Sequence, residues 1–445
     1  MENTKITSSD IGISNCYKYF RDGWCIIHIE GDPYTRGKGY GYLIANEMTA
    51  IRNMLVNTTP IFYGHEWEYF VNKTTEIYGD TIPDEYKREL QGIVDGMSKI
   101  GSNWSYPELL AWNCQISIQD YWWRITQLGK CNETERCSSF IATGDATYDG
   151  KIILAHNTWD VYYNGQYCNC IVEVIPETGN TILMQTFYGY ISSLTDFFTT
   201  SAGIVGCDTT IGNFNVWKPG VPCFVRLRNA LQYAETLDSF TQYMLQGNGG
   251  DYANTWYLGD INTNEIMKFE LGVNYHSIKT KTNGYFIGFN EAENNKIRNL
   301  ECKTQNIFNI KWSSGARRVR LRQLLEQNKG HINITIAKQI ISDHYDVYTK
   351  KNQHSGRTIE ARYDLDDEGS YSRPPNYPHG AVDAKIISSE LAAKMSFIAR
   401  WGSSSGLEFN RDQFCDKNPQ WGFLREYLKN RPTQPWTTIK GRRIN

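Results

Sequence analysis

A cysteine at the start of a predicted strand, followed one strand later by a histidine and an asparagine, could perform nucleophilic chemistry. These residues are Cys137, in RCSSF, and the pair His156 and Asn157, in LAHNTW. A thiolate attacks acyl carbons readily, and a nearby cation or hydrogen-bond donor raises the thiolate population. A buried structural cysteine and an ordinary histidine at a strand end would give the same spacing, and spacing alone favours that simpler explanation.

Two predicted strands, 138–143 and 151–156, must position these residues. The turn between them ends in an Asp-Gly pair, which indicates an antiparallel hairpin. A loop centred on 146–147 would place Cys137 opposite the His-Asn pair, whereas a tight turn at the Asp-Gly pair would place it opposite Tyr162. The first register is the simpler one and brings the thiol against the histidine, but the sequence leaves both open.

The elements around this hairpin change character at about residue 137. Before it, we expect a strand at 22–31 and helices at 33–57, from 83 onward and at 106–121. After it, we expect further strands at 254–259, 265–270 and 284–289, helices at 223–246, 313–328 and 334–343, and a long polar loop at 351–380. Helices before strands, and then both interleaved, indicate an α+β fold of stacked layers rather than a doubly wound sheet.

The composition excludes some classes of function. With 46 basic and 48 acidic residues the net charge is −2, so no basic surplus points to nucleic-acid binding. No run approaches the roughly 20 apolar residues of a transmembrane segment, and the polar first residues lack the core of a signal peptide. The 29 Tyr, 18 Phe and 13 Trp favour an aromatic-rich core or, alternatively, an apolar cleft for acyl chains.

The sequence leaves the cellular compartment open. Glycosylation sequons occur at Asn57, Asn72, Asn103, Asn132 and Asn333, although a chain rich in Asn and Thr forms such triplets by chance. The 11 cysteines fit five disulfides and one free thiol, or free buried thiols in a reducing compartment. As given, the chain looks unexported, and the formation of a homo-oligomer is equally open.

Many blocks of the sequence resemble one known group of proteins, nearly from end to end. CSSF followed by AHNTWD is similar to the nucleophile region of the phospholipase B-like family and of the related autoproteolytic acyltransferases and amidases of the isopenicillin-N acyltransferase type. Further blocks that resemble this group are GWCIIHIEGDPYTRGKGYGYLIA, GCDTTIGNFN, GGDYANTWYLGD, GYFIGFN, SSGARRVRLRQLL and ARWGSSSG. The order and number of these blocks argue against chance agreement.

The resemblance implies a four-layer αββα fold of the N-terminal-nucleophile hydrolases, built as one integrated domain. It also implies cleavage between Arg136 and Cys137, giving a smaller, mainly helical chain of residues 1–136 and a catalytic chain of residues 137–445. The freed α-amine of Cys137 could act as general base, because its reference pKa of about 7.7–8.0 lies near working pH. The thiol would form a thioester that water cleaves, with no cofactor and no metal ion.

The resemblance also assigns the other site residues. His156 and Asn157 fall where relatives carry a polar group beside the nucleophile, and Asn290 falls where the family places an asparagine that donates to the oxyanion. Arg317 or Arg318 matches an arginine that supports the site. The residues placed near the substrate are Trp159, Thr210, Asn213, Asn254 and Arg318.

Each assignment has a structural alternative, and the sequence departs from the family in places. Asn290 could cap a turn, Asn213 could bond a loop backbone, and one of the two arginines could be a surface residue of its helix. Arg136, after Glu135, stands where a small residue is more ordinary at a self-cleavage bond. Ser404 replaces a cysteine of the family, and the leader lacks the secretion signal usual in eukaryotic relatives.

Three other interpretations compete with a cysteine hydrolase. The segment GSSSG, at 402–406, fits the serine-hydrolase elbow, but the last histidine, His379, lies upstream of it rather than downstream. Cys168 and Cys170 lack a second pair at zinc-site spacing, so a disulfide or a core pair is favoured over a metal. The third is a catalytically silent family member, retained as a structural or lipid-binding protein.

The sequence does not distinguish between several classes of substrate. Relatives of the resembling group act on phospholipid esters, N-acyl amides and peptides. We expect a small acyl-amide or lipid substrate with an apolar acyl group, because aromatic residues crowd the blocks around the site. These residues are Trp159, Tyr162, Tyr163, Phe187, Tyr188 and Tyr190.

Overall fold

The computed structural model describes residues 4–131, 136–304, 306–369 and 373–441, so Asn132 and Glu135 lie outside the described residues. The chain divides into two compact units, each built from several stretches of sequence. Unit 1 comprises Met1–Asn132, Tyr167–Ala202 and Asn215–Tyr252, and unit 2 comprises Glu133–Gln166, Gly203–Phe214 and Ala253–Asn445. Every residue predicted to act with Cys137 in catalysis falls in unit 2.

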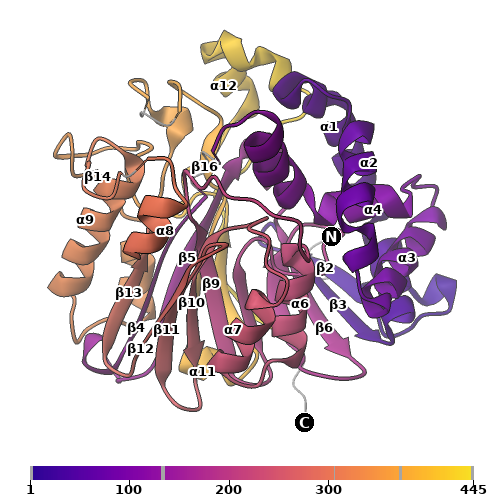
Figure 1. Ribbon diagram of the computed structural model, residues 1–445, viewed down its shortest axis with the longest axis horizontal. Helices are drawn as coiled ribbons and strands as arrows, with labels where there is room; N and C mark the ends of the chain where they lie inside the picture. Colours follow the sequence, from indigo (N-terminus) through magenta and orange to yellow (C-terminus); the bar gives the residue numbers. More distant parts are fainter. Residues whose placement is uncertain (1–3, 132–135, 305, 370–372, 442–445) are drawn as a thin grey trace. The chain divides into compact units, whose positions relative to one another are not determined.

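Unit 1 combines helices with a sheet, of which Figure 1 labels β2, β3 and β6. The strand order of this sheet is β1-β2-β3-β6-β7-β8. The strands are β1 (Ile6–Thr7), β2 (Tyr17–Arg21), β3 (Trp24–Gly31), β6 (Cys170–Pro176), β7 (Ile182–Thr186) and β8 (Phe197–Thr200). The helices are α1 (Pro33–Tyr63), α2 (Trp67–Tyr78), α3 (Asp84–Ser98), α4 (Tyr106–Asn113), a π-helical segment (Ile116–Gln127), α6 (Cys223–Tyr233) and α7 (Leu237–Leu245). Strands β3 and β6 are parallel, although they are far apart in sequence.

Helix α1 shows how this unit is specified locally. Asp32 caps the helix by accepting two backbone N–H bonds, and Pro33 occupies the first turn. Its early glycines lower helix propensity, but they are positions of close contact. A Cβ atom on Gly37 would collide with the carbonyl oxygen of Glu89 in α3. The absence of side chains there lets the two helices pack backbone to backbone.

Among its described residues, unit 2 contains two large sheets and the small sheet of β14 (Tyr345–Asp346) and β15 (Lys351–Asn352). The first is antiparallel and runs β9 (Ile204–Thr210), β10 (Asn254–Asp260), β11 (Glu265–Leu271) and β12 (His276–Lys281). The second runs β13 (Gly284–Gly288), β4 (Cys137–Thr143), β5 (Ile153–Val161), β17 (Asp383–Ser388), β18 (Ser396–Trp401) and β19 (Thr437–Lys440), with β16 (His379–Ala381) paired to β5. The hydroxyl of Tyr257 in β10 donates to the carbonyl oxygen of Ile287 in β13 at 2.8 Å, so the two sheets face each other.

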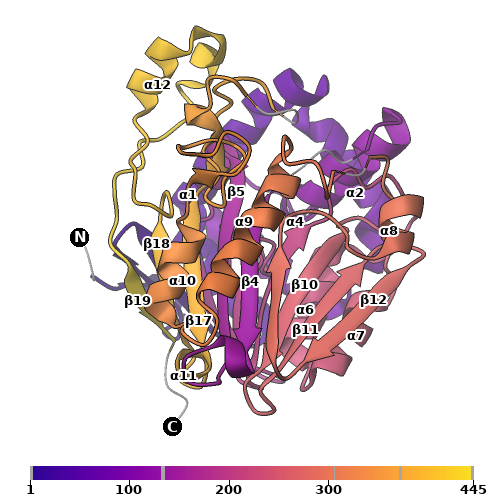
Figure 2. The same cartoon turned by 90° about the vertical axis from the view of Figure 1, so that its left-hand side faces the viewer.

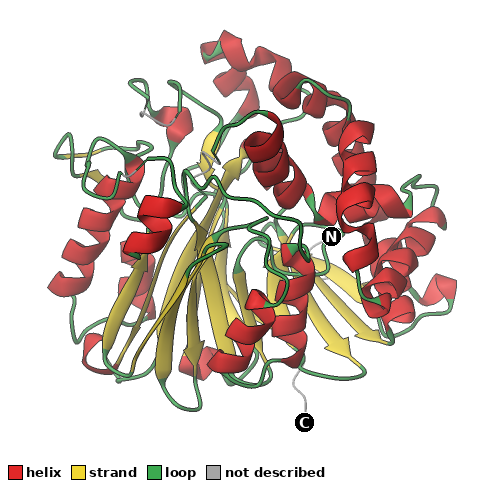
Figure 3. Ribbon diagram, viewed as in Figure 1, coloured by secondary structure: helices red, strands yellow, loops and turns green. Residues whose placement is uncertain are grey.

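Helices cover the outer face of the second sheet. Figure 2 shows α9 (Ser313–Gln327) and α10 (Ile334–Ile341) lying along β4 and β17. One buried cluster joins Phe140 and Ile386 of the sheet to Leu325 and Ile340 of these helices. Shorter elements complete the unit (Figure 3): α5 (Tyr162–Gly165), α8 (Asn295–Leu300), β14 (Tyr345–Asp346), β15 (Lys351–Asn352), α11 (Ser389–Ala392) and α12 (Arg411–Lys417).

The predicted α+β sandwich is confirmed. Unit 2 stacks a sheet, a second sheet and a helical layer, and unit 1 packs helix α1 on strand β3. The predicted helix 223–246 is interrupted at Ala234, and the predicted helix 106–121 becomes α4 and the π-helical segment. Among the described residues, no helix combines the length and hydropathy needed to cross a bilayer. The described residues include all 11 cysteines, and none of them is in a disulfide.

Candidate functional site

The hairpin that carries Cys137 is present, but its register differs from the predicted one. Strands β4 and β5 are antiparallel, with Cys137 opposite Thr158, Ser138 opposite Asn157 and Ser139 opposite His156. A 3-10 turn at Gly144–Ala146 and the residues after it shift the centre of the hairpin. The predicted placement of Cys137 opposite the His-Asn pair, and its alternative opposite Tyr162, are therefore both wrong.

Side chains alternate between the two faces of a strand, so this register sorts the site residues into two groups. Cys137, His156 and Thr158 share the face directed toward the sheet of β9–β12. Asn157 and Trp159 share the opposite face, where Asn157 Nδ2 donates to the carbonyl oxygen of Ile341 in α10 at 3.2 Å. The residues predicted to surround Cys137 therefore lie on both faces of the sheet and not on one.

The peptide bond between Arg136 and Cys137 is held by hydrogen bonds on both sides. The backbone N–H of Trp159 donates to the Arg136 carbonyl oxygen. The N–H of Cys137 donates to Oδ1 of Asn290 at 3.3 Å, and Nη1 of Arg317 donates to the Cys137 carbonyl oxygen at 2.8 Å. The thiol side chain is fully buried in this uncut chain. The bond predicted for self-cleavage is thus fixed in orientation by three residues.

Asn290 reaches Cys137 because strand β13 ends in a left-handed turn. Gly288 of β13 pairs with Ser139 of β4, so continuing the ladder by two residues puts Asn290 beside Cys137. The φ of Asn290 is 65°, a region that asparagine tolerates better than most residues. Its Nδ2 donates to the Thr210 carbonyl oxygen at 2.9 Å. Both ends of the amide are engaged in the uncut chain, and donation to an oxyanion stays a prediction.

Arg317 is the arginine at the site. It lies on the second turn of α9, fully buried, and Nη2 donates to Oδ1 of Asn290 at 3.0 Å. Its guanidinium also lies 4.1 Å from the ring centre of Trp159, within cation–π range. Arg318, the next residue of the helix, instead covers the ring of Phe308 at 5.3 Å. One helical step, about 100°, separates the two side chains, so Arg318 points away from Arg317.

His156 is neutral in its surroundings. It is fully buried opposite Lys385 of β17. Burial holds its pKa well below the usual value, the charge of Lys385 adds to this, and a hydrogen bond with the backbone of Asp208 opposes it. His156 therefore supplies no cation for the thiolate at neutral pH, and the residue directly opposite it across the hairpin is Ser139 rather than Cys137.

A buried ion pair behind Thr158 was missed by sequence reasoning. Lys385 Nζ donates to Thr158 Oγ1 at 2.6 Å and lies 2.8 Å from Oδ1 of Asp383. Asp383 Oδ1 also accepts from the N–H of Thr158 at 3.0 Å. Thr158 is the residue opposite Cys137, so this pair fixes the strand beside the thiol. The available signal was the strand VDAK, in which two opposite charges share one face of an otherwise apolar strand.

Asp208 is the second residue that the sequence analysis missed. It is fully buried in β9, and a carboxylate oxygen lies within 4.8 Å of Cys137 Sγ. A carboxylate at this distance favours a cationic neighbour, such as a protonated α-amine on the same cysteine. Thr210, one of the predicted site residues, lies two positions further along the same strand, so strand alternation places Asp208 on the same face.

Asn157 and Trp159 brace the hairpin from the helix side. Oδ1 of Asn157 accepts from the N–H of Ser138 and from Nε1 of Trp159, both at 3.0 Å. Nδ2 of Asn157 donates to Ser404 Oγ at 3.2 Å. Ser404, considered above as part of a serine-hydrolase elbow, is therefore fully buried and serves as a hydrogen-bond acceptor behind Cys137.

Of the other residues predicted to lie near the substrate, Thr210 and Asn254 lie on paired strands and Asn213 lies in a turn. Thr210 ends β9, opposite Asn254 at the start of β10, and both are fully buried. Neither polar atom of the Asn254 side chain has a hydrogen-bond partner among the described residues. Asn213 lies beyond the strand in a left-handed turn, where its carbonyl oxygen accepts from Lys303. This bond involves the main chain of Asn213, and the role of its side chain stays a prediction.

The aromatic residues expected around the site are divided between the units. In unit 2, the hydroxyl of Tyr162 donates to Asp364 at 2.7 Å, and Arg431 covers its ring at 3.7 Å. In unit 1, Phe187 and Tyr190 pack against Trp112. Tyr163 and Tyr188 are buried in units 2 and 1, respectively. These contacts describe packed interior, which favours the aromatic-core explanation of the composition.

Comparisons with known proteins connect this arrangement to curated relatives. An uncharacterised protein of Archaeoglobus fulgidus is 23% identical over 257 residues, which cover 54% of this chain and 42% of that protein. Putative phospholipase B-like 2 of Rattus norvegicus is 31% identical over 141 residues, covering 28% of this chain and 24% of that protein. Phospholipase B-like protein A of Dictyostelium discoideum is 23% identical over 312 residues, covering 62% and 53%. The chain thus spans about half or less of the length of these relatives.

A solved structure and a family model complete the comparison. A mutant of conjugated bile acid hydrolase from Clostridium perfringens has a TM-score of 0.35 and 9% identity, covering 59% of this chain and 89% of that chain. Similarity at this level carries no inference about fold or activity. The family model for phospholipase B matches residues 107–431. Because this match extends over well more than half of the sequence, the chain belongs to the phospholipase B family.

Proposed function

We propose that this chain is a self-processing cysteine hydrolase of the N-terminal-nucleophile type, which cleaves linear amide or acyl-ester bonds through a thioester on Cys137. The observation that supports this most directly is the set of bonds around the Arg136–Cys137 peptide. Trp159, Asn290 and Arg317 contact, in turn, the carbonyl before the bond, the N–H of the bond and the carbonyl after it. These are the groups whose charge and position change during cleavage.

The first reaction is an attack of Cys137 Sγ on the carbonyl carbon of Arg136. A C–S bond forms, and the negative charge that develops on the carbonyl oxygen is stabilised by the N–H of Trp159. The C–N bond then breaks, and the thiol proton passes to the departing amine, which Asn290 Oδ1 keeps in place. Water hydrolyses the thioester, leaving Arg136 as a carboxyl terminus and Cys137 as the first residue of the chain 137–445.

The second reaction uses the same atoms on an external substrate. The free α-amine of Cys137 accepts the thiol proton, because its reference pKa of about 7.7–8.0 suits a general base near neutral pH. The carboxylate of Asp208 favours the resulting ammonium. Sγ attacks the acyl carbonyl, the amine or alcohol leaves with that proton, and water cleaves the thioester. Asn290 acts here as a positioning residue for the amine.

Departure of the chain end at Arg136 opens the thiol to a substrate in this scheme. Cys137 is fully buried while the peptide bond is intact. Arg136 itself is anchored by Nη1, which lies 3.4 Å from Oδ1 of Asp160. Cleavage and activity are therefore coupled: an uncut chain should be inert toward acyl substrates even though its thiol is present.

We propose apolar acyl groups as the preferred substrate class. The family name and the printed names of the relatives point to phospholipid esters, and the sequence resemblance adds N-acyl amides and peptides. Trp159, which lies fully buried under the Arg317 guanidinium, is on the face of the hairpin opposite Cys137 and braces the strand that carries the site. A small substrate of this kind needs no cofactor in the mechanism above.

A substrate panel tests this proposal. The purified protein would be incubated with N-acyl amides of increasing chain length and with lysophospholipids, and the products would be measured by mass spectrometry. We expect turnover that rises with acyl length, an acyl adduct on the peptide beginning at Cys137, and loss of both in Cys137→Ala. Cys415→Ala, which removes a buried thiol on α12, should retain turnover.

Two outcomes would count against the proposal. Turnover of small polar amides alone would contradict an apolar acyl preference. Absence of turnover and of the adduct, in a chain that has been cleaved before Cys137, would favour the silent family member that acts as a structural or lipid-binding protein. No specific contact favours a catalytically silent protein, because Cys137 and the residues that hold its backbone, Asn290 and Arg317, are all present.

A further inference from the structure

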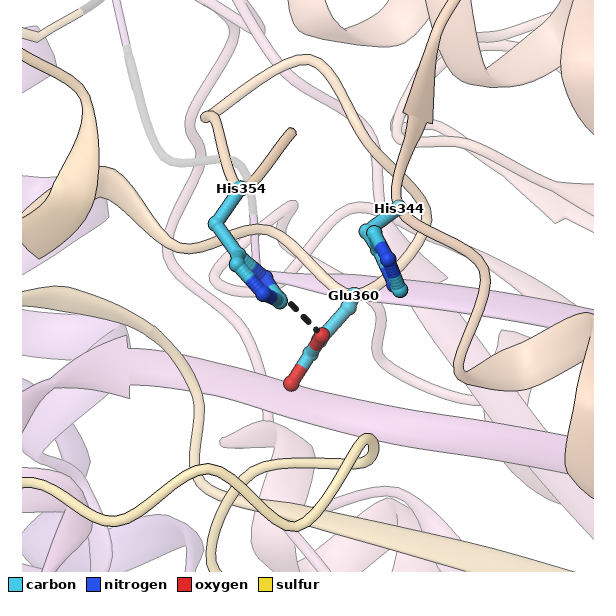
Figure 4. Close-up of side chains that lie close together, drawn as sticks. All are labelled: His344, His354 and Glu360. Carbon is cyan, nitrogen blue, oxygen red and sulfur yellow. Dashed lines mark ion pairs between the residues drawn. The ribbon is translucent and has the colours of Figure 1, made fainter. Parts of the chain in front are cut away.

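A group of three potential metal ligands lies in the loops of unit 2, apart from the thiol. Figure 4 shows the side chains of His344, His354 and Glu360 turned toward one another. One ligand atom from each lies within 4.8 Å of the other two. The two imidazole rings are stacked, with centres 4.7 Å apart and planes 25° from parallel. Nothing in the hydrolase mechanism above uses these residues.

Glu360 is an unusual carboxylate because it is fully buried and only one of its oxygens is well bonded. Oε1 accepts from the N–H and hydroxyl of Ser405, at 3.1 and 2.8 Å, and from the hydroxyl of Ser403. Oε2 has no hydrogen-bond partner among the described residues and lies 3.5 Å from Nδ1 of His354. Burying such an oxygen without a partner is costly unless a cation binds there.

The carboxylate of Glu360 is held in place through one of its oxygens. Ser403 and Ser405 fix Oε1, and Oε2 is directed toward the imidazoles of His354 and His344. A carboxylate fixed through one oxygen in this way has the form of a preorganised ligand.

The imidazole of His344 is oriented by the backbone. Its Nδ1 lies 3.4 Å from the carbonyl oxygen of Ser342, and a proton on Nδ1 is donated to that oxygen. This tautomer leaves the Nε2 lone pair as a ligand, which is the usual arrangement behind metal-bound histidines. His354 is partly exposed, with 23% of its side chain accessible, so it can adjust its position and gives solvent ions a way in.

We propose that His344, His354 and Glu360 bind one divalent transition-metal ion of the zinc type. Two imidazole nitrogens and one carboxylate oxygen form a donor set that such ions favour over Mg²⁺ or Ca²⁺, and three protein ligands leave a position for water. Tetrahedral coordination would bring the ligand atoms to about 3.3 Å from one another. The ion must therefore draw the imidazoles toward Oε2 from the present spacing.

The place of this group in the fold indicates what a bound ion would do. Nδ2 of Asn157 donates to the carbonyl oxygen of Ile359 and to Ser404 Oγ, at 3.3 and 3.2 Å. Ile359 precedes Glu360, and Ser404 lies between the two serines that hold its carboxylate. Asn157 in turn bonds the N–H of Ser138, next to Cys137. A metal ion here would lock the two loops that brace the catalytic strand.

An ion pair between His354 and Glu360, with His344 merely stacked on it, would also occupy these positions. The two explanations differ in what added metal does. An ion pair gives no stoichiometric uptake of Co²⁺ or Zn²⁺ and no change in thermal stability on chelation. A metal site gives both, and both depend on His344 as well as on His354.

The test is a titration of the metal-free, tag-free protein with Co²⁺ and Zn²⁺, followed by calorimetry, visible absorption and thermal melting. We expect one ion per chain, absorption bands of Co²⁺ bound to nitrogen and oxygen, and a Tm several degrees higher with metal. His344→Ala, His354→Ala and Glu360→Gln should each weaken binding at least tenfold. His331→Ala, which removes an exposed histidine, should bind as the wild type does.

Some controls separate binding from folding and from other ligands. If Glu360→Gln does not fold, the two histidine variants decide, because both replace partly exposed side chains. Absorption typical of thiolate–Co²⁺ bonds, or equal binding by the His344→Ala and His354→Ala variants, would overturn the proposal. So would a wild type that takes up no ion. None of these readouts depends on hydrolase activity, so the site and the proposed enzyme can fail separately.

Discussion

The bonds of one side chain, Asn290, set the geometry of the proposed cleavage. Its Oδ1 accepts from Cys137 and Arg317, and its Nδ2 is held by the Thr210 carbonyl. Asn290 therefore cannot rotate its amide without losing a bond at both ends. The sequence pointed to this residue through resemblance, but its contact with the amine follows only from the left-handed turn that ends β13.

Replacing Asn290 separates the side chain from the backbone conformation. Asn290→Gly keeps the left-handed turn and removes the amide, whereas Asn290→Ala also strains the backbone by roughly 1 kcal/mol. Both should slow self-cleavage at least tenfold, which corresponds to about 1.4 kcal/mol in the barrier. Fragment formation over time and urea unfolding measure the two effects. Cleavage of Asn290→Gly at the wild-type rate would show that the amine is positioned by other groups.

The buried, neutral His156 predicts how stability depends on pH. Its pKa is held well below 6.5 in the folded chain, first by burial and then by Lys385. Below about pH 6.5 the unfolded chain takes up a proton on this histidine and the folded chain does not. The free energy of unfolding therefore decreases as the pH is lowered, by up to about 1.4 kcal/mol per pH unit. His156→Gln should flatten this slope between about pH 5 and pH 6.5, as measured by urea unfolding.

The control for that experiment is His331→Gln, because His331 is exposed. It should leave the slope of stability against pH as it is in the wild type. A slope that is unchanged in His156→Gln would mean that other groups, such as the buried His379, carry the dependence. The pKa of His379 is also lowered, mainly by burial.

Single residues show where sequence reasoning succeeded and where it could not. Cys137, Asn290 and the pair Arg317 and Arg318 were selected because they sit in blocks that resemble a known family, and the structure brings Cys137, Asn290 and Arg317 together. Asp208 and Lys385 were missed, since a charged residue inside a strand is read from sequence as solvent-exposed. Only the second sheet, packed over the first, shows that these charges are buried beside the thiol.

At the level of elements, strand β13 depends on one glycine. A Cβ atom on Gly288 would collide with Ser139 Oγ and would lie 2.6 Å from Cγ2 of Thr209 and 2.8 Å from Cε2 of Tyr257. The two sheets approach closely here, two residues from Asn290. The glycine therefore sets the spacing that brings β13 alongside the start of β4.

Gly288→Ala should weaken the chain and its processing together. We expect a loss of about 1–3 kcal/mol in unfolding free energy from overpacking, with slower cleavage because Asn290 is displaced from Cys137. Gly422→Ala is the matched control, since a Cβ atom there meets nothing within 4 Å. Normal stability and cleavage in Gly288→Ala would contradict the close approach of the sheets at this point.

Most helices, and the strands in which apolar and polar residues alternate strongly, were predictable from the sequence. The way in which the strands pair was not. Helices α3 and α10 carry clear apolar periodicity, and the predicted positions of α1, α3, α9 and α10 are confirmed. The register of β4 on β5 was wrong because the turn at Gly144–Ala146 has no distinctive sequence. The strands from β16 to β19 were missed since they are short and partly polar, and they become strands only by pairing with β5 and one another.

On the scale of the whole molecule, cleavage need not separate the two fragments. Strand β3 belongs to residues 1–136 and pairs in parallel with β6, from residues 137–445, over the seven positions Cys25–Gly31 and Cys170–Pro176. Both strands are largely buried within unit 1. The backbone bonds and apolar contacts of this unit do not depend on the bond at Cys137.

The cleaved protein should therefore behave as one particle. We expect fragments 1–136 and 137–445 to co-elute in size-exclusion chromatography, at the volume of uncut Cys137→Ala, and to separate only in denaturant. Elution of two independent species under native conditions would contradict the shared sheet of unit 1.

The most direct test of the central claim is the mass of the purified chain under denaturing conditions, with the amino-terminal sequence of each species. The wild type should give two species, the larger of which begins CSSF. Cys137→Ala should give one full-length species of similar thermal stability. A wild type that stays whole after prolonged incubation, or a Cys137→Ala variant that still breaks before residue 137, would contradict self-processing by this thiol.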